Sequence, residues 1–341
     1  MKVVSGRSHP ALARDICEYL GVPLGRTESF KFKNDNSFVR ILESVRQMDC
    51  YVVQPSCFPV NDNLVELLLM LDALLRASAR SITVVMPYYA YGRSDKKDQP
   101  RIPITASLMA RLLETAGASR VLTMDLHAEQ IQGFFRIPVD QLLAAPVICR
   151  YIQQKAIGDL VAVAPDAGST RRTAEYARLL AIPMAILDKR RTSNDDRAHV
   201  VSLSGDVKGK NTILFDDEIS TAGTLVSAVE VLKNAGAQKV YAGVTHPVLC
   251  GDALERIERS GLEELVVTNT LPLPPGRVST KIKVLSVAPL LASAIYRIHH
   301  GHSLNALFSD EWETIFPAAS SPRAPGTQAF EGTLPGRLSP P

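Results

Sequence analysis

The chain has 341 residues, of which 46% are hydrophobic, and this is enough apolar material for the cores of two ordinary domains. Its 38 basic and 35 acidic residues leave a formal net charge of +3, which is too balanced to favour a whole-surface affinity for nucleic acid or membranes. We therefore expect a soluble globular protein that binds no nucleic acid and no membrane, and that binds anions only at local sites.

In chain order, short β-branched runs alternate with longer amphipathic ones. The predicted strands of the first half are residues 2–4, 51–53, 82–86 and 121–124, and those of the second half are residues 160–164, 184–187, 212–215, 240–244 and 265–268. Residues 64–75 are apolar with acids at helical spacing, which is typical of a helix packed on a sheet. Such alternation predicts an α/β fold with two doubly wound parallel sheets.

Two rounds of the pattern predict two domains, residues 1–145 and residues 146–310, with a hinge near residues 145–154. From residue 316 the composition changes to Pro, Ser, Gly and Arg, so that residues 316–341 are predicted to be a disordered tail.

The amino end has no apolar run of signal-peptide length, and no later run reaches the roughly 18 apolar residues of a membrane-spanning helix. These features predict a cytoplasmic protein. The cysteines are scattered without a CxxC pair, which argues against a zinc ribbon or a redox dithiol. Buried free thiols are the prediction for all five: Cys17, Cys50, Cys57, Cys149 and Cys250.

Three polar segments follow predicted strands. Residues 88–98 form a basic loop flanked by tyrosines, which taken alone would be a solvated charged turn. His127 and Asp166 each come just after a strand end, although a lone histidine at such a place is more often a packing residue than a ligand. Residues 188–196 are basic and polar, as in a mobile loop.

The strongest local motif is residues 212–224, which predict a strand, a loop and a helix. Small residues from Ser220 to Thr224 let backbone NH groups close around a phosphate at the amino end of the helix. Asp216 and Asp217 would then accept hydrogen bonds from the hydroxyls of a sugar carrying that phosphate. The alternative is a capped helix whose preceding acids lie in solvent. A GxxxxGK[ST] phosphate loop is absent, so an ordinary nucleotide kinase fold is not expected.

This motif resembles the phosphoribosyl diphosphate loop shared by type I phosphoribosyltransferases and phosphoribosyl diphosphate synthetases. The rest of the chain is similar to the synthetases, also called ribose-phosphate diphosphokinases, over about 300 residues that include residues 3–6, 61–64 and 305–309. The resemblance implies two domains of phosphoribosyltransferase type I-like architecture. It implies transfer of the diphosphate of ATP to the carbon 1 oxygen of ribose 5-phosphate, with Mg²⁺ as cofactor, giving 5-phosphoribosyl 1-diphosphate and AMP.

The resemblance also implies roles for individual residues. ATP would be bound by Phe32, Asn34, Asn36, Arg93, Ser94, Asp98 and His127. Ribose 5-phosphate would be bound by Asp216, Asp217, Ser220, Thr221, Ala222, Gly223 and Thr224. The metal would be bound by His127 and Asp166, and Lys189 and Arg191 would be catalytic. The family forms homo-oligomers, hexamers built from dimers, in which the residue matching Phe32 reaches the adenine of a neighbouring subunit.

Four positions depart from the family pattern: Asn36 and Arg40 where acids are usual, Ser94 where a glutamine is usual and Ser220 where an aspartate is usual. They motivate two further hypotheses, a regulatory paralogue that assembles with an active synthetase, and an enzyme of the same chemistry with a different nucleotide donor or sugar phosphate. The intact pairs favour the active synthetase, since the chemistry needs Asp216 with Asp217, Lys189 with Arg191 and His127 with Asp166.

Overall fold

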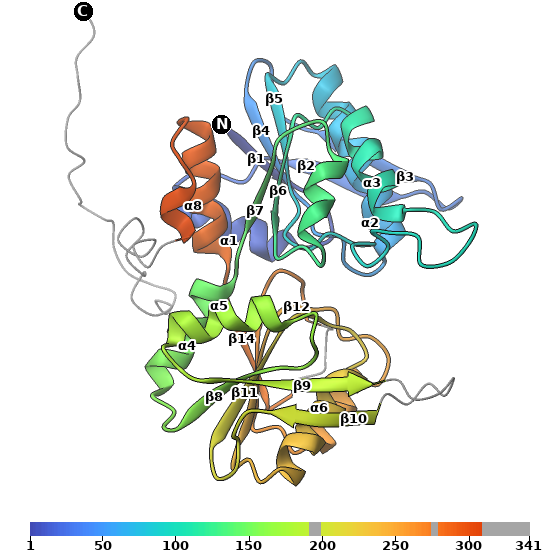
Figure 1. The fold of residues 1–341 in the computed structure, drawn as a ribbon. Helices are drawn as coiled ribbons and strands as arrows, with labels where there is room; N and C mark the ends of the chain where they lie inside the picture. The colour runs from blue at the N-terminus through green and yellow to red at the C-terminus, as the bar shows by residue number, and fades with distance from the viewer. Residues whose placement is uncertain (191–198, 274–278, 309–341) are drawn as a thin grey trace, which may run out of the picture.

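The computed structural model describes residues 1–190, 199–273 and 279–308, and of residues 188–190 and 199–202 it describes the backbone only. Within these residues the chain forms two α/β halves, one above the other in Figure 1, each built on its own sheet. The predicted tail at residues 316–341 and the catalytic candidate Arg191 lie outside the described residues, as does the side chain of Lys189.

The sheet of the first half is parallel, with the order β1-β4-β5-β6-β7. Its strands are β1 (Lys2–Ser5), β4 (Asp49–Val53), β5 (Ser81–Val85), β6 (Arg120–Met124) and β7 (Val139–Leu142). Buried β-branched residues dominate β5, as is usual where both faces of a parallel sheet are covered.

The sheet of the second half has the order β10-β9-β8-β11-β12-β13-β14 and is parallel except for the antiparallel edge strand β10. Its strands are β8 (Leu160–Ala164), β9 (Met184–Arg190), β10 (His199–Ser204), β11 (Asn211–Ile219), β12 (Val240–Pro247), β13 (Glu264–Thr268) and β14 (Ile282–Leu285). The central strands β8, β11 and β12 have their carboxyl ends toward the first half, which is where ligands bind in such sheets.

Helices cover both faces of each sheet. They are α1 (Pro10–Leu20), α2 (Val60–Arg76), α3 (Thr105–Thr115), α4 (Ala145–Lys155), α5 (Thr170–Leu180), α6 (Gly223–Asn234), α7 (Ala253–Arg259) and α8 (Ala288–His299), with short 3-10 turns at Glu129–Phe134 and Asn305–Phe308. On α2 the buried residues Leu67, Met70, Leu71 and Leu74 recur at helical spacing and pack on the first sheet. Burying such a stripe is the main source of stability for an amphipathic helix.

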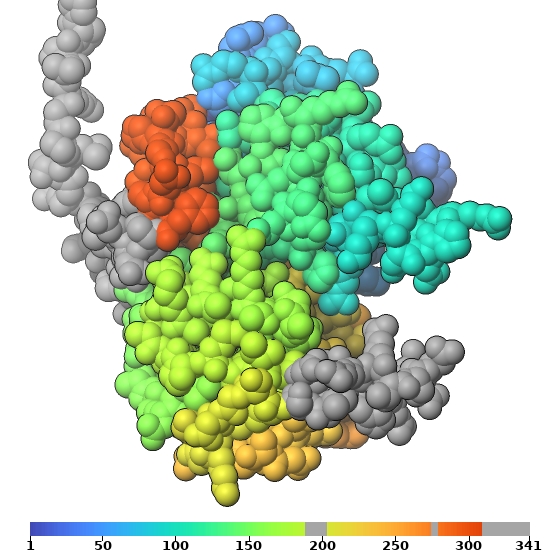
Figure 2. Space-filling model, in the orientation of Figure 1, coloured from blue at the N-terminus to red at the C-terminus, as the bar shows by residue number. Residues whose placement is uncertain are grey.

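The last helix, α8, returns to the first half and packs on α1 (Figure 1). Figure 2 shows its orange-red atoms against the upper half of the molecule. One continuous core joins buried residues of both halves, including Leu12 of α1, Ile148 of α4, Tyr176 of α5 and Leu291 of α8. The predicted second domain, residues 146–310, therefore includes a helix that packs on the other half. We propose that the domain unit of the first half is residues 1–145 together with α8.

A hairpin of β2 (Thr27–Lys31) and β3 (Ser37–Ile41) forms a separate antiparallel pair beside α2 (Figure 1). The sequence patterns did not predict this hairpin, nor β7, β10 and β14. The strands of the hairpin are only half-buried and mix Ser, Glu and Arg with apolar residues, so neither shows a clean alternation.

The prediction of two doubly wound α/β sheets is confirmed, and β8 has the predicted bounds. The prediction that β11 ends at Phe215 was wrong, because the strand continues through three acids to Ile219. Four cysteines are buried and form no disulfide, but Cys250 is exposed, so the prediction of burial was wrong for that residue. Its loop lies between β12 and α7, where the Cys250 Sγ is 3.0 Å from the Ser220 Oγ.

Across the described residues, no helix is long and apolar enough to span a membrane.

A buried polar network fixes the end of β6 against the second half. The Nε2 of His246, on β12, lies 3.1 Å from the Met124 carbonyl oxygen, and its Nδ1 lies 3.0 Å from the Thr270 Oγ1. The Thr245 Oγ1 donates to the Asp125 carboxylate at 2.8 Å, as does the backbone NH of Ala144. Because carbonyls only accept, His246 must donate through Nε2, and burial lowers its pKa to about 4, so the ring is neutral.

We predict that His246→Gln changes how stability depends on pH. Between pH 6.5 and about 4 the unfolded chain protonates His246 while the folded chain does not, so the wild type loses stability as the pH falls through this window. Glutamine keeps an NH donor but does not titrate. The free energy of unfolding of the variant minus that of the wild type should rise by on the order of 3 kcal/mol as the pH falls across the window. Urea denaturation at each pH would measure it.

The neighbouring Asp125 has its pKa raised by burial to about 6 and acts in the opposite sense, but it is common to both proteins and cancels in the difference. A difference that stays constant with pH would contradict a neutral, buried His246.

Candidate active site

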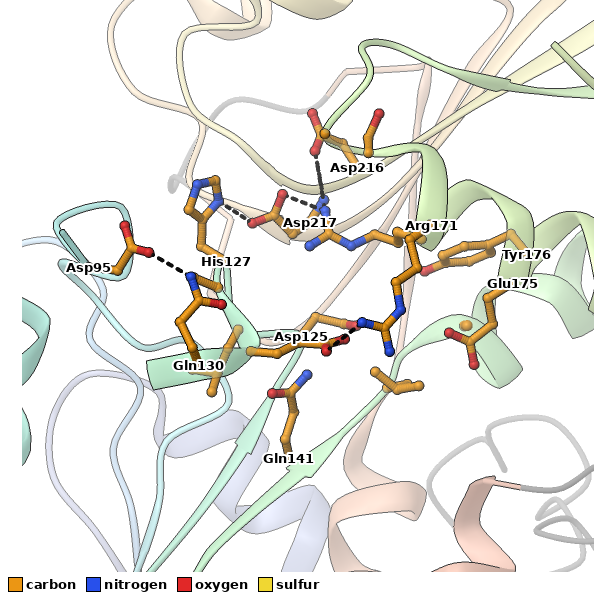
Figure 3. A pocket seen from close by; sticks show the side chains of 18 of the residues that line it. Asp95, Asp125, His127, Gln130, Gln141, Arg171, Glu175, Tyr176, Asp216 and Asp217 are labelled. Atoms are coloured by element: carbon orange, nitrogen blue, oxygen red, sulfur yellow. Dashed lines mark hydrogen bonds and ion pairs between the residues drawn. The ribbon is translucent and has the colours of Figure 1, made fainter. Parts of the chain in front are cut away.

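A cavity of about 640 Å³ opens between the two halves, at the carboxyl ends of β6, β8 and β11. Figure 3 shows it from close by. Its polar lining comes from both halves: Asp95, Lys96, Asp125, His127, Glu129, Gln130, Gln141, Asp166, Ser169, Arg171, Arg172, Glu175, Asp216 and Asp217. A large pocket lined by charges of both signs suits a small polar or charged ligand better than an apolar one.

Asp217 is bonded to a basic side chain from each half. Its Oδ2 lies 2.7 Å from the His127 Nδ1, and its Oδ1 accepts a hydrogen bond of 2.7 Å from the Arg172 Nη1 (Figure 3). The Asp217 side chain is only 5% exposed. His127 lies just past β6 of the first half and Arg172 lies on α5 of the second, so this one carboxylate joins the two halves in the floor of the pocket.

The two adjacent aspartates differ in their affinity for protons. Burial acts to raise the pKa of Asp217, but the hydrogen bond from His127 and the charge of Arg172 outweigh it and hold that pKa well below its usual range. Burial and the neighbouring Asp217 charge raise the pKa of Asp216, although its side chain is 37% exposed to the pocket. Asp217 is therefore ionised, and Asp216 is the carboxyl of the pair that holds a proton more readily.

The His127 ring is oriented by the same contact. The hydrogen bond to Asp217 raises the pKa of His127, and desolvation opposes this rise. Since an ionised carboxylate can only accept, the proton of the neutral ring sits on Nδ1, and the lone pair of Nε2 is left for a ligand. A carboxylate behind a histidine is the usual support for a metal-binding imidazole.

Asp166 follows β8 and lines the same pocket. Its Oδ1 accepts a hydrogen bond of 2.9 Å from the backbone NH of Ser169, which leaves Oδ2 for a ligand. Among the residues that the structure describes, no group of three or more His, Cys, Asp or Glu side chains is arranged to hold a metal ion. His127 and Asp166 can thus supply two ligands at most, which fits Mg²⁺ only when a ligand phosphate supplies further oxygens.

The predicted phosphate loop lies at the end of β11, beyond the residues that line the pocket. Ala222 adopts a left-handed conformation with φ of 61°, and α6 begins at Gly223. This turn brings the amino end of α6 next to the strand that carries Asp216 and Asp217. The members of the loop are Ser220, Thr221, Ala222, Gly223 and Thr224.

The predicted nucleotide loop lies between β5 and α3. The Arg93 Nε forms an ion pair of 2.5 Å with the Glu218 Oε1 of β11, and the Ser94 Oγ lies 3.2 Å from the Thr105 Oγ1. Asp98 is exposed and does not line the pocket. Two members of the loop that the sequence did not single out, Asp95 and Lys96, do line it.

The remaining ATP candidates lie away from the pocket of their own chain. Phe32, Asn34 and Asn36 are exposed residues at the tip of the β2–β3 hairpin, and none lines the pocket. The Phe32 backbone NH donates to the Asn36 carbonyl at 2.8 Å, and the Phe32 ring, 49% exposed, packs edge-on against Phe30. The hairpin therefore presents an aromatic ring outward.

Of the predicted site residues, the structure brings His127, Asp166, Asp216 and Asp217 into one pocket, with Arg93 adjoining through Glu218. Sequence reasoning missed Arg172 and Glu218. The only signal for Arg172 was a pair of arginines in the first turn of a helix that follows the Asp166 loop. The roles of Lys189 and Arg191 stay predictions, since the described residues do not include their side chains.

Comparison with known proteins supports the resemblance inferred from the motifs. A family described as the N-terminal domain of ribose phosphate pyrophosphokinase matches residues 1–117, and one described as the phosphoribosyl synthetase-associated domain matches residues 192–309. The ribose-phosphate pyrophosphokinase of Caldanaerobacter subterraneus is 51% identical over 310 residues, 91% of this chain and 98% of the relative. That of Bacillus subtilis is 48% identical over 309 residues, 91% of this chain and 97% of the relative.

A crystal structure of phosphoribosylpyrophosphate synthetase from Mycobacterium smegmatis has the same fold. It is 41% identical in sequence, its TM-score is 0.83, and the match covers 88% of this chain and 99% of that chain. The predicted type I-like architecture is confirmed by this likeness.

We predict that Asp217→Asn lowers the pKa of His127, because the variant removes the negative charge, and one of the two acceptor oxygens, that raise it. Histidine ring signals followed by NMR through a pH titration would measure the shift. Asp166→Asn makes the same chemical change in the same pocket without touching the His127 ring, and should leave the His127 pKa raised. An unchanged His127 pKa in Asp217→Asn would contradict the contact.

Proposed function

We propose that this chain, which belongs to the ribose-phosphate pyrophosphokinase family, carries out the reaction of that family in the pocket between its two sheets. The protein makes 5-phosphoribosyl 1-diphosphate from ATP and ribose 5-phosphate. The observation that carries the choice of site is the hydrogen bond between His127 and Asp217, because it joins the predicted nucleotide residue to the predicted sugar residue.

The sugar phosphate binds along β11 and the turn that follows it. Asp216 and Asp217 accept hydrogen bonds from the ribose hydroxyls, and the backbone NH groups of residues 220–224 hold the 5-phosphate at the amino end of α6. Arg172 supports this arrangement because it keeps Asp217 ionised and fixed in direction.

ATP binds from the side of the first half. Arg93 contacts the phosphates or base, with Ser94, Asp98 and His127 nearby, and Lys189 and Arg191 neutralise the diphosphate as charge shifts between its oxygens. The anomeric oxygen of the sugar attacks the β-phosphorus and forms the new P–O bond, while the bond from that phosphorus to the α–β bridging oxygen breaks. AMP leaves in line with the attack, and the anomeric proton passes to solvent.

Mg²⁺ is the expected cofactor, held by the His127 Nε2 and the Asp166 Oδ2 together with phosphate oxygens. When bound, it would neutralise part of the charge on the diphosphate. Because the described residues bring no group of three ligand side chains together here, the phosphates must complete the set, so metal and nucleotide should bind together.

We propose that the protein works in the cytoplasm as a homo-oligomer, a hexamer built from dimers, without nucleic acid or membrane partners. The support on the protein surface is the outward-facing Phe32, since this ring lies outside its own pocket and is free to stack on the adenine in a neighbouring subunit. Asn34 and Asn36 at the same hairpin tip would contact the same nucleotide.

Purified protein with ATP and Mg²⁺ should form AMP only when ribose 5-phosphate is present, matched by phosphoribosyl diphosphate in phosphorus NMR. Lys189→Ala should lower kcat by at least about 100-fold, because it removes a charge that stabilises the transition state. Lys210→Ala, which breaks only a surface ion pair with Asp206, is the control and should keep nearly full activity.

A folded wild type that shows no activity but co-assembles with an active synthetase would favour the regulatory paralogue. Activity with a different nucleotide or sugar phosphate, and none with ATP and ribose 5-phosphate, would favour the enzyme of the same chemistry with a different donor or acceptor.

The shared adenine site predicts complementation between two inactive chains. Phe32→Ala keeps its own pocket, and Asp217→Asn keeps its own Phe32, so an oligomer mixed by co-expression contains some sites with both parts intact. Random mixing in equal amounts should restore up to about a quarter of wild-type activity. Activity no greater than the sum of the two separate variants would show that Phe32 does not serve a neighbouring pocket.

A further inference from the structure

Glu218 follows the two site aspartates on β11 and is one of four buried carboxylate residues among those that the structure describes. Its side chain is 8% exposed. Its Oε1 forms the ion pair of 2.5 Å with the Arg93 Nε, and its Oε2 accepts a hydrogen bond of 3.3 Å from the Tyr88 hydroxyl. Both partners belong to the loop that follows β5 in the first half, so Glu218 joins the halves beside the contact made by Asp217.

Glu218 lies beside the buried polar network around His246, which fixes the end of β6 against the second half. Glu218 pairs in register with His246 of β12, and the Tyr88 ring lies 5.1 Å from the His246 ring. A Cβ added to Gly92 would lie 3.5 Å from the His127 Cβ, so the residue that precedes Arg93 is packed directly against the metal and nucleotide candidate. Arg93 is therefore held next to His127 by a short, tightly packed segment.

The ion pair leaves part of Arg93 available to a ligand. Glu218 engages the Nε, whereas the Arg93 side chain as a whole is 58% exposed. A guanidinium carries five N–H donors in a rigid plane, so fixing Nε fixes the direction of the two terminal amino groups. A buried carboxylate next to another carboxylate is costly unless it is paired. Burial and the Asp217 charge raise the pKa of Glu218, and the Arg93 charge offsets only part of this rise.

We propose that Glu218 is a positioning residue that orients the Arg93 guanidinium toward ATP and so couples the sugar-binding strand to the nucleotide site. The proposal rests on the proposed function, in which Arg93 contacts ATP. Asp217 and Glu218 then form a pair of neighbouring carboxylates on one strand, and each holds one basic residue of the first half, His127 and Arg93.

The test is Glu218→Gln, which keeps the size and an acceptor for the Tyr88 hydroxyl but removes the charge that holds Arg93. We expect the KM for ATP to rise about 10-fold, with kcat and the KM for ribose 5-phosphate changed by less than about threefold. Glu264→Gln is the matched control, because Glu264 also lies on a strand, pairs with a basic side chain, Lys155, and accepts a hydrogen bond from a tyrosine, Tyr151, but lies outside the pocket. It should leave both KM values unchanged.

A double-mutant cycle separates this proposal from the role of Arg93 itself. If Glu218 acts through Arg93, then Glu218→Gln should add little to the defect of Arg93→Ala. An equal effect of Glu218→Gln in both backgrounds, a lowered KM for ATP, or a rise only in the KM for ribose 5-phosphate would overturn the proposal. A normal KM for ATP in Arg93→Ala would instead show that the assigned role of Arg93 is wrong, whatever Glu218 does.

Discussion

The Asp217 carboxylate is the group on which the rest of the site depends. It is buried, it is the direct link between His127 of the first half and Arg172 of the second, and it stays ionised because both partners are basic. An unpaired buried carboxylate is costly, so each partner is needed to keep it charged. The two sheets are held in a position that permits this contact by His246 and Thr245, which bond the end of β6 to β12. The pocket between the halves is thus a consequence of how two parallel sheets meet at their carboxyl ends.

In diphosphate transfer the protein contributes mainly by aligning the substrates and neutralising charge, and it forms no covalent bond to them. In this chain, consecutive residues of β11 serve both needs. Asp217 and Glu218 hold two basic residues of the first half, His127 and Arg93. In the proposed function Asp216 and Asp217 face the sugar, and these two basic residues face the nucleotide. Movement of one sheet relative to the other would disturb both sets of contacts together.

The sequence predicted the parts of the fold that depend on local patterns. Strand β8 is a continuous apolar run bounded by turn residues, and its bounds were found correctly. The motif around Asp216 and Asp217 and the strand-end positions of His127 and Asp166 placed four residues that the fold brings together. Arg172 and Glu218 were missed because an arginine on a helix and a glutamate at a strand end are usually exposed to solvent. The sequence alone does not show that these two are instead in ion pairs at the pocket. Docking of α8 on α1 could not be predicted either, since it depends on contacts between residues far apart in the chain. Cys250 was misplaced because burial in a loop is set by neighbouring elements, which composition does not reveal.

The most direct measurement is a crystal structure of the protein with ribose 5-phosphate, a non-hydrolysable ATP analogue and Mn²⁺ in place of Mg²⁺. We predict that the ribose hydroxyls lie within hydrogen-bond distance of Asp216 and Asp217, that the 5-phosphate lies at the amino end of α6, and that an anomalous signal for Mn²⁺ lies beside His127 and Asp166. A sugar bound elsewhere, with Asp217 contacting only His127 and Arg172, would contradict the assignment of this pocket as the active site.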